Sequence, residues 1–149
     1  MSAKRPDLGA PCPCGGGEYG RCCGRFHLAP DLGASTLTDP RELVRARYAA
    51  FVLGDLPFVR ATESRERPPI RSLDPRVRYK RLTLLDADLP ALRVLFAVDV
   101  LARGVDASFV ELSGFAVEER LVYVAGILLR KKLGEPIART IAEHEQLVR

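Results

Sequence analysis

All four cysteines of the chain fall within the twelve-residue segment Cys-Pro-Cys-Gly-Gly-Gly-Glu-Tyr-Gly-Arg-Cys-Cys. Cys12, Cys14, Cys22 and Cys23 supply the four thiolates that a tetrahedral structural zinc site uses. Free thiols normally scatter through a core as small hydrophobic residues, and a disulfide between the adjacent Cys22 and Cys23 would be strained. Neither of these alternatives explains the clustering. The segment therefore predicts a zinc site, with zinc as the cofactor of the chain.

A second ligand set stays open for this site. His27 lies four residues beyond Cys23, and an imidazole is also a good zinc ligand. Three cysteines with His27 in place of Cys23 would complete the same coordination sphere. With either set, the first 27 residues are too few to bury a core of their own. We expect them to fold on the metal, which supplies on the order of 10 to 16 kcal/mol in zinc-finger peptides.

The cysteine segment resembles a known zinc-binding module. Cys12 to Cys23 is similar to the SEC-C motif, found in the tail of the bacterial preprotein-translocase motor, where it contacts a chaperone and the ribosome. Gly24, Arg25, Phe26 and His27 resemble more specifically the N-terminal end of YchJ-like bacterial proteins. The resemblance implies that residues 1–27 form a SEC-C-like module that contacts a protein or ribosomal partner.

The composition places the chain among cytoplasmic proteins with no membrane contact. The N-terminal residues carry no apolar segment typical of a signal peptide, and the longest apolar run, Leu121 to Leu129, is too short to span a bilayer. The formal net charge of +4 could suit an anionic partner. No basic stripe interleaved with aromatic residues is present, however, so we do not expect direct binding of nucleic acid.

The remaining residues predict two helices after a linker. Residues 28–38 lack a hydrophobic period and contain Pro30 and Gly33, which is typical of a linker. A helix is predicted from residue 39, where Thr38 or Asp39 can cap it, to Gly54. Asp55 can cap a second, shorter helix.

The pattern then changes to a period of two, which predicts an antiparallel meander with strands over residues 77–85, 92–102, 108–117 and 121–129. Helices followed by an antiparallel meander indicate an α+β fold over residues 39–130. Both faces of the strand at 92–101 are apolar, which predicts helices on one face and a further layer, or the second subunit of a homodimer, on the other. Residues 131–149 are predicted to be a C-terminal helical extension, with the helix over Gly134 to Arg149 and Pro136 in its first turn.

The same family resemblance continues into this region. Residues 45–55 are similar to the helix that follows the zinc motif in YchJ-like proteins, and residues near Tyr123 and Gly126 resemble their last two strands. The resemblance implies a nuclear transport factor 2-like (NTF2-like) domain, in which helices and a curved sheet enclose a cone whose mouth often holds a small ligand. It covers about Cys12 to Gly126.

Few residues of this cone are candidates for a catalytic or ligand-binding role. Asp99 lies in the middle of an apolar strand, where a carboxylate must be paired or have its pKa raised, and Arg47 is its predicted partner. Tyr48 and Glu111 complete the candidate pocket residues. A structural ion pair between Arg47 and Asp99 is the alternative to a functional one. Where YchJ-like proteins tend to have Trp-His-Pro, this chain has Glu63, Ser64 and Arg65, so most polar groups of a reactive pocket are missing.

Two functions follow from these observations. The first is a non-enzymatic zinc-binding protein whose SEC-C-like module contacts a partner, with no catalytic residue assigned, because four protein ligands close the zinc sphere. The alternative is a small-molecule binding protein or hydrolase with its site in the cone. A pocket that contains Asp99, Arg47 and Tyr48 would favour the alternative, and a cavity filled by phenylalanine side chains would exclude it.

Overall fold

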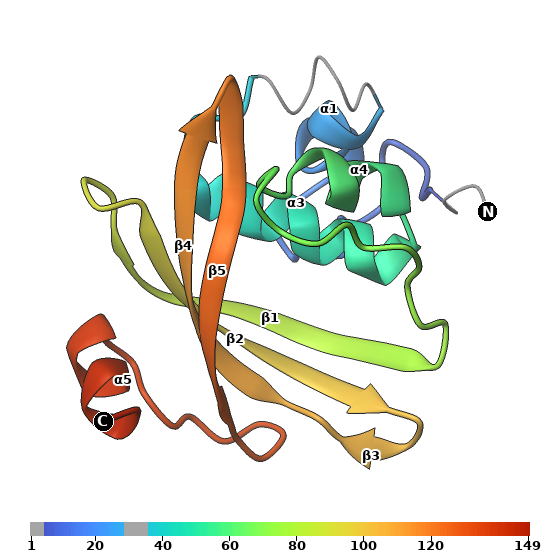
Figure 1. Ribbon diagram of the computed structural model, residues 1–149. Coiled ribbons are helices and arrows are strands. Elements are labelled where there is room, and N and C mark those ends of the chain that lie inside the picture. The colour runs from blue at the N-terminus through green and yellow to red at the C-terminus, as the bar shows by residue number, and fades with distance from the viewer. Residues whose placement is uncertain (1–4, 29–35) are drawn as a thin grey trace.

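A curved antiparallel sheet with helices on its concave side makes up most of the molecule, which confirms the predicted α+β class (Figure 1). The computed structural model describes residues 5–28 and 36–149. Its strands pair in the order β1-β2-β4-β5, and β3 extends the sheet beside β2. The strands are β1 (Val77–Asp88), β2 (Arg93–Ala102), β3 (Val105–Asp106), β4 (Phe109–Glu118) and β5 (Arg120–Arg130). The four predicted strands are therefore confirmed to within a few residues at each end.

Two helices lie on the concave side of the sheet, and the first of them packs directly on it (Figure 1). The long helix α3 (Pro40–Leu53) packs on β1 and β2, and the short helix α4 (Leu56–Ala61) packs on α3. The Asp39 side chain accepts a hydrogen bond from the Arg41 amide at the start of α3, and Gly54 ends it with a φ of 72°. Asp55 caps α4 by accepting from the Phe58 amide. Both predicted helices and their caps are confirmed.

The N-terminal segment folds as a small knuckle against these helices. The second pair of cysteines lies between a short 3-10 helix, η1 (Tyr19–Arg21), and a single-turn helix, α1 (Gly24–His27). All four cysteines belong to the same buried apolar cluster as Leu43 of α3 and Val94 of β2. The knuckle therefore shares its core with the cone.

The C-terminal segment covers part of the opposite, convex face of the sheet (Figure 1). Ile141 packs with Leu95 of β2 and with Val110 and Leu112 of β4, which supplies the further layer predicted for this strand. The helix α5 (Ile141–Leu147) is shorter than predicted. Residues 134–140 are not helical, because the helix begins after Thr140, whose side chain accepts a hydrogen bond from the Glu143 amide, and Pro136 precedes it in irregular chain.

The predicted linker lies mostly outside the described residues, and at its end Leu37 is already buried in the core. Within residues 5–28 and 36–149, no helix combines the length and the apolar character that crossing a bilayer requires.

Candidate metal centre and ligand pocket

The structure brings the sulfur atoms of all four cysteines together in one buried group. The four sulfur atoms lie within 4.8 Å of one another. Cys14 Sγ lies 3.3 Å from Cys22 Sγ, and Cys22 Sγ lies 3.9 Å from Cys23 Sγ. A tetrahedral zinc with Zn–S bonds of about 2.3 Å would place its sulfur ligands about 3.8 Å apart. The donor set and its spacing therefore fit a closed four-thiolate zinc site.

Gly16 lies directly against these sulfur atoms. A Cβ at this position would be 3.0 Å from Cys22 Sγ and 3.2 Å from Cys14 Sγ. A side chain would push against the sulfur atoms, so glycine lets the backbone pass close to the site. The same point lies 3.6 Å from Arg45 Nη1 of α3, which brings a positive charge close to the thiolates.

The pKa values of three of the cysteines shift in different directions. Hydrogen bonds from Cys12 and Cys23 lower the pKa of Cys14 to about 2. Burial raises the pKa of Cys22 to about 12, and hydrogen bonding with Cys12 raises that of Cys23. A bound cation would favour the thiolate at every ligand, since a thiol that coordinates a metal is deprotonated outright.

His27 is placed away from the sulfur group and has other partners. Its Nε2 donates to the carbonyl oxygen of Ala46 at 2.8 Å, which leaves Nδ1 to accept from the Tyr19 hydroxyl, also at 2.8 Å. The side chain is fully buried, and burial lowers its pKa, so the ring is neutral. Both nitrogens are thus occupied in hydrogen bonds, and the alternative ligand set would have to break one of them.

A second candidate site lies inside the cone. A cavity of about 410 Å³ opens between α3 and the concave face of the sheet. Its walls are mostly aromatic and aliphatic, and Phe96, Phe109 and Phe115 line it without filling it. Arg47, Tyr48 and Glu111, three of the four candidate pocket residues, are among the residues that line it. Burial raises the pKa of Tyr48 to about 12, so its hydroxyl stays protonated at neutral pH.

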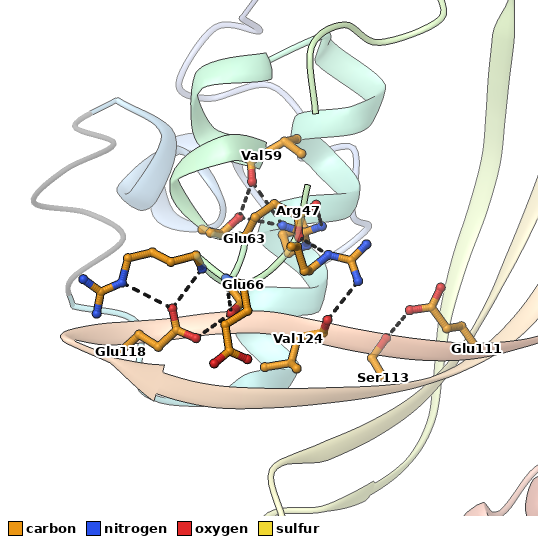
Figure 2. Close-up of polar contacts among 12 residues, drawn as sticks. Arg47, Val59, Glu63, Glu66, Glu111, Ser113, Glu118 and Val124 are labelled. Atoms are coloured by element: carbon orange, nitrogen blue, oxygen red, sulfur yellow. Dashed lines mark hydrogen bonds and ion pairs between the residues drawn. The ribbon is translucent and has the colours of Figure 1, made fainter. Parts of the chain in front are cut away.

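Two arginines and one glutamate that line this cavity form a charged cluster (Figure 2). Arg47 Nη2 lies 3.5 Å from Glu63 Oε1, and Arg67 Nε lies 3.0 Å from Glu63 Oε2. Both guanidinium groups also lie over the ring of Tyr123, at 4.7 and 4.6 Å from its centroid. Arg47 Nη1 donates in addition to Thr62 Oγ1 at 2.8 Å, and Arg67 Nη1 donates to the carbonyl oxygen of Val124 at 2.8 Å.

Glu63 reaches this position through a pairing at the edge of the sheet. The Tyr123 amide donates to the carbonyl oxygen of Thr62 at 2.8 Å, and the Ser64 amide donates to that of Tyr123 at 2.9 Å. The chain that leaves α4 is therefore joined to β5 by an isolated bridge at Glu63. This bridge aims the Glu63 carboxylate at the arginines.

Glu111 of β4 forms no ion pair with that cluster among the described residues, and its carboxylate accepts a hydrogen bond from the Ser113 hydroxyl (Figure 2). A Cβ at Gly126 of β5 would overlap this carboxylate and lie 2.7 Å from Tyr123 Oη. Glycine at position 126 therefore leaves the room in which Glu111 and Tyr123 meet. Burial, and next the charge of Glu111, raise the pKa of Tyr123.

The predicted pair between Asp99 and Arg47 is wrong. Val98 and Val100 line the cavity, and because side chains alternate along a strand, Asp99 lies on the opposite face of the sheet. There it pairs with Lys131 and accepts from the Gly134 amide at 3.0 Å, which ties down the C-terminal segment. Burial raises the pKa of Asp99, but these hydrogen bonds outweigh it and hold the pKa below its usual value.

The interpretation that most polar pocket groups are missing is also wrong. Glu63, Arg67, Ser113 and Tyr123 all line the cavity. The period of two already put Ser113 on the same face as Glu111, and this signal could have identified Ser113. No local sequence pattern predicts that Glu63 and Arg67 line the cavity, because a contact between segments far apart in the sequence brings them there.

Comparisons with known proteins agree with this architecture. The profile of the family described as YchJ, middle NTF2-like domain, matches residues 39–126. A UPF0225 protein of Cupriavidus metallidurans is 43% identical over 76 residues, which are 50% of this chain and 51% of that protein. A UPF0225 protein of Streptomyces coelicolor is 44% identical over 78 residues, which are 51% of this chain and 60% of that protein. The chain thus spans about half the length of the curated relatives it matches. No solved structure matches the chain.

Proposed function

The chain belongs to the YchJ-like family, whose middle domain has an NTF2-like fold, and from this premise we propose that it binds a small, mostly apolar molecule in the cone. The cavity of about 410 Å³ carries this proposal. Ligand sites in proteins typically have about 300 to 1,000 Å³, apolar walls and a few placed polar groups. This cavity has all three properties.

We propose binding without turnover as the basic activity. Three of the charged groups that line the cavity are directed at one another, because Glu63 contacts both Arg47 and Arg67. Groups paired in this way orient a ligand more readily than they transfer protons. The hydrolase alternative needs a nucleophile and a base that are free to react.

The cysteine group serves this function as a structural zinc site. Four protein ligands would leave no position for water or substrate, so the metal would stabilise the fold and not carry out chemistry. Metal analysis of the purified protein should give one zinc per chain. A protein that contains no zinc and keeps its N-terminal fold in a strong chelator would contradict this assignment.

A pair of matched variants tests the pocket. Ala107 lines the cavity, whereas Ala91 lies exposed in the turn before β2. We expect neutral aromatic compounds to bind the wild-type protein with a stoichiometry of one in isothermal titration calorimetry. Ala107→Trp should fill the cavity and weaken binding by about tenfold or more, while Ala91→Trp should leave it unchanged. Equal affinity in the two variants would rule out the cone as the site.

A second candidate function is contact with a ribosomal or protein partner through the knuckle. Residues 15–18 are exposed, and the Arg21 side chain beside them is 89% exposed. This outward face could meet a partner while the zinc holds its shape. Co-sedimentation with purified ribosomes tests the idea: Arg21→Glu should reduce the bound fraction, whereas Arg71→Glu, in an exposed loop far along the chain, should not. No sedimentation of the wild-type protein would exclude the ribosome as the partner.

A further inference from the structure

The charges that line the cavity balance one another. Arg47 and Arg67 contribute two positive charges, and Glu63 and Glu111 contribute two negative charges. Arg47 is only 8% exposed and Glu111 only 9%. Transfer of an unpaired charge into a poorly solvated site costs several kcal/mol. A ligand with a net charge of either sign would therefore disturb a site that is already neutral.

The arginines are poorly placed to receive an anion. The two guanidinium groups share Glu63, donate to Val59, Thr62 and Val124, and stack on Tyr123. A ligand carboxylate that approached them would lie next to the Glu63 carboxylate. Repulsion between the two carboxylates would offset the attraction of the arginines.

Glu111, in contrast, can accept a further hydrogen bond from a ligand. The carboxylate accepts hydrogen bonds from the hydroxyl groups of Ser113 and Tyr123, and among the described residues no cation lies within ion-pair distance of it. An ionised carboxylate has about four acceptor positions, so these two donors leave room for another. A buried acceptor gains most from a hydrogen bond, because leaving it unpaired costs about 1 to 3 kcal/mol. The unused acceptor positions of Glu111 are thus the natural partner for a donor on the ligand.

The walls around this acceptor favour a flat, aromatic ligand. Phe96 and Phe109 meet edge to face with centroids 6.4 Å apart, and Tyr48 and Tyr79 do so at 5.7 Å. Aromatic side chains bind other rings by stacked and edge-to-face contacts. The ring of a ligand could extend either of these pairs.

We propose that the ligand is an uncharged aromatic compound that carries an N–H or O–H group and donates it to Glu111. This inference rests on the proposed function, and it adds the chemical class of the ligand. A site built around a buried acceptor discriminates strongly against an analogue that lacks the donor. Tighter binding of a compound that carries the donor than of its analogue without the donor is therefore the measurable result that this proposal predicts.

Four related probes test the class of ligand. 2-Phenylindole offers an N–H group, and 1-methyl-2-phenylindole has the same rings without it. The derivatives of 2-phenylindole that carry a carboxylate or an aminomethyl group on the phenyl ring add one negative or one positive charge. Titration of the zinc-loaded protein, followed by probe fluorescence and by calorimetry, should show that 2-phenylindole binds about tenfold more tightly than each of the other three.

Two variants connect that preference to Glu111. Glu111→Leu combined with Ser113→Ala removes the acceptor without leaving the Ser113 hydroxyl unpaired, and Ser113→Ala alone keeps the acceptor. The preference for N–H over N-methyl should fall below about twofold in the double variant and persist in the single one. Circular dichroism and thermal unfolding verify that both variants are folded.

The outcomes separate the two proposals. If all four probes bind the wild-type protein equally well, the ligand class is wrong and the binding function stands. A charged probe that binds more tightly than 2-phenylindole, or a preference that survives in the double variant, also contradicts the class. If none of the four probes binds, the proposed function fails together with the inference.

Discussion

His27 donates a hydrogen bond from Nε2 to the carbonyl oxygen of Ala46, 2.8 Å away, and thereby joins the knuckle to the helix that forms one wall of the pocket. The ring also packs edge to face on Phe58 of α4, with centroids 4.7 Å apart. Arg5 adds an ion pair of 3.3 Å to Asp55 at the start of the same helix. His27 is therefore a buried connector between the two parts of the molecule.

This placement predicts that His27 and Cys23 differ in their effect on the metal. His27→Phe should retain one zinc per chain, because the four sulfur atoms stay in place, but should lower the free energy of unfolding by about 1 to 3 kcal/mol, because buried hydrogen bonds to Tyr19 and Ala46 are lost. Cys23→Ser should lose the metal. Zinc content after dialysis against a competing chelator distinguishes the two variants. Loss of zinc in His27→Phe but not in Cys23→Ser would assign the fourth ligand to the histidine.

Removal of zinc should loosen the helices more than the sheet. The knuckle contacts α3 and α4 through Ala46, Phe58 and Asp55, whereas β5 makes its main contacts with β4. After chelation, amide hydrogen exchange should become faster in residues 40–61 and change little in residues 109–130. Addition of zinc should restore the original rates. Unchanged exchange in the helices would show that the knuckle is attached without supporting them.

Gly126→Ala should destabilise the protein. The new Cβ would overlap the Glu111 carboxylate, and relief of that overlap would shift side chains at a cost of about 1 to 3 kcal/mol. Gly9→Ala is the control, because a Cβ there meets no atom within 4 Å. Urea unfolding measures both variants. Glu111→Ala in the Gly126→Ala background should recover part of the loss, and the absence of any recovery would mean that the strain lies elsewhere.

Arg47→Met should be among the most destabilising substitutions in the cone. It removes a buried partner of Glu63, and breaking a buried ion pair from one side costs about 3 to 5 kcal/mol. Glu63 keeps Arg67, which places the expected loss near the lower end of this range. In a double-mutant cycle with Glu63→Gln, the two effects should sum to more than the loss in the double variant. Additive effects would show that the two side chains are not coupled.

Attachment of the C-terminal segment should weaken in acid. The folded pKa of Asp99 lies below its unfolded value of about 3.9, so its contribution to stability is complete above that value and is lost as the pH falls through the folded pKa. Hydrogen exchange of α5 should therefore become faster, relative to that of β4, as the pH falls below about 4. Asp99→Asn should remove this dependence, and Asp7→Asn, in the exposed N-terminal segment, should retain it. Identical pH profiles in Asp99→Asn and the wild type would contradict the role of Asp99.

The secondary structure was predictable because its signals are local. Asp39, Gly54 and Asp55 mark helix ends by their own chemistry, and the period of two located the four long strands. The family and the NTF2-like fold were confirmed by the comparisons. The end of the chain was less predictable, because Pro136 and Thr140 can both begin a helix and only the structure shows that Thr140 does.

The site was predictable where neighbours in sequence act together and not where distant segments meet. Four cysteines in one short segment can hardly avoid contact, and the structure brings them together. Glu63 and Arg67 reach the pocket because the chain after α4 pairs with Tyr123, a contact of about sixty residues in sequence that no local period records. The alternation of side chains along β2 placed Asp99 on one face of the strand. Both faces of this strand are apolar, however, so the sequence did not indicate which of them is the concave one, and Asp99 was assigned to the wrong side.

The continuous core shared by the knuckle and the cone has a consequence for the cell. Because Cys12 and Phe115 belong to one apolar cluster, zinc held by the cysteines as proposed would also stabilise the walls of the cavity. A cell short of zinc would hold fewer molecules with a formed binding site, even at an unchanged level of synthesis. The supply of zinc would then influence how many molecules of this protein have a formed cavity.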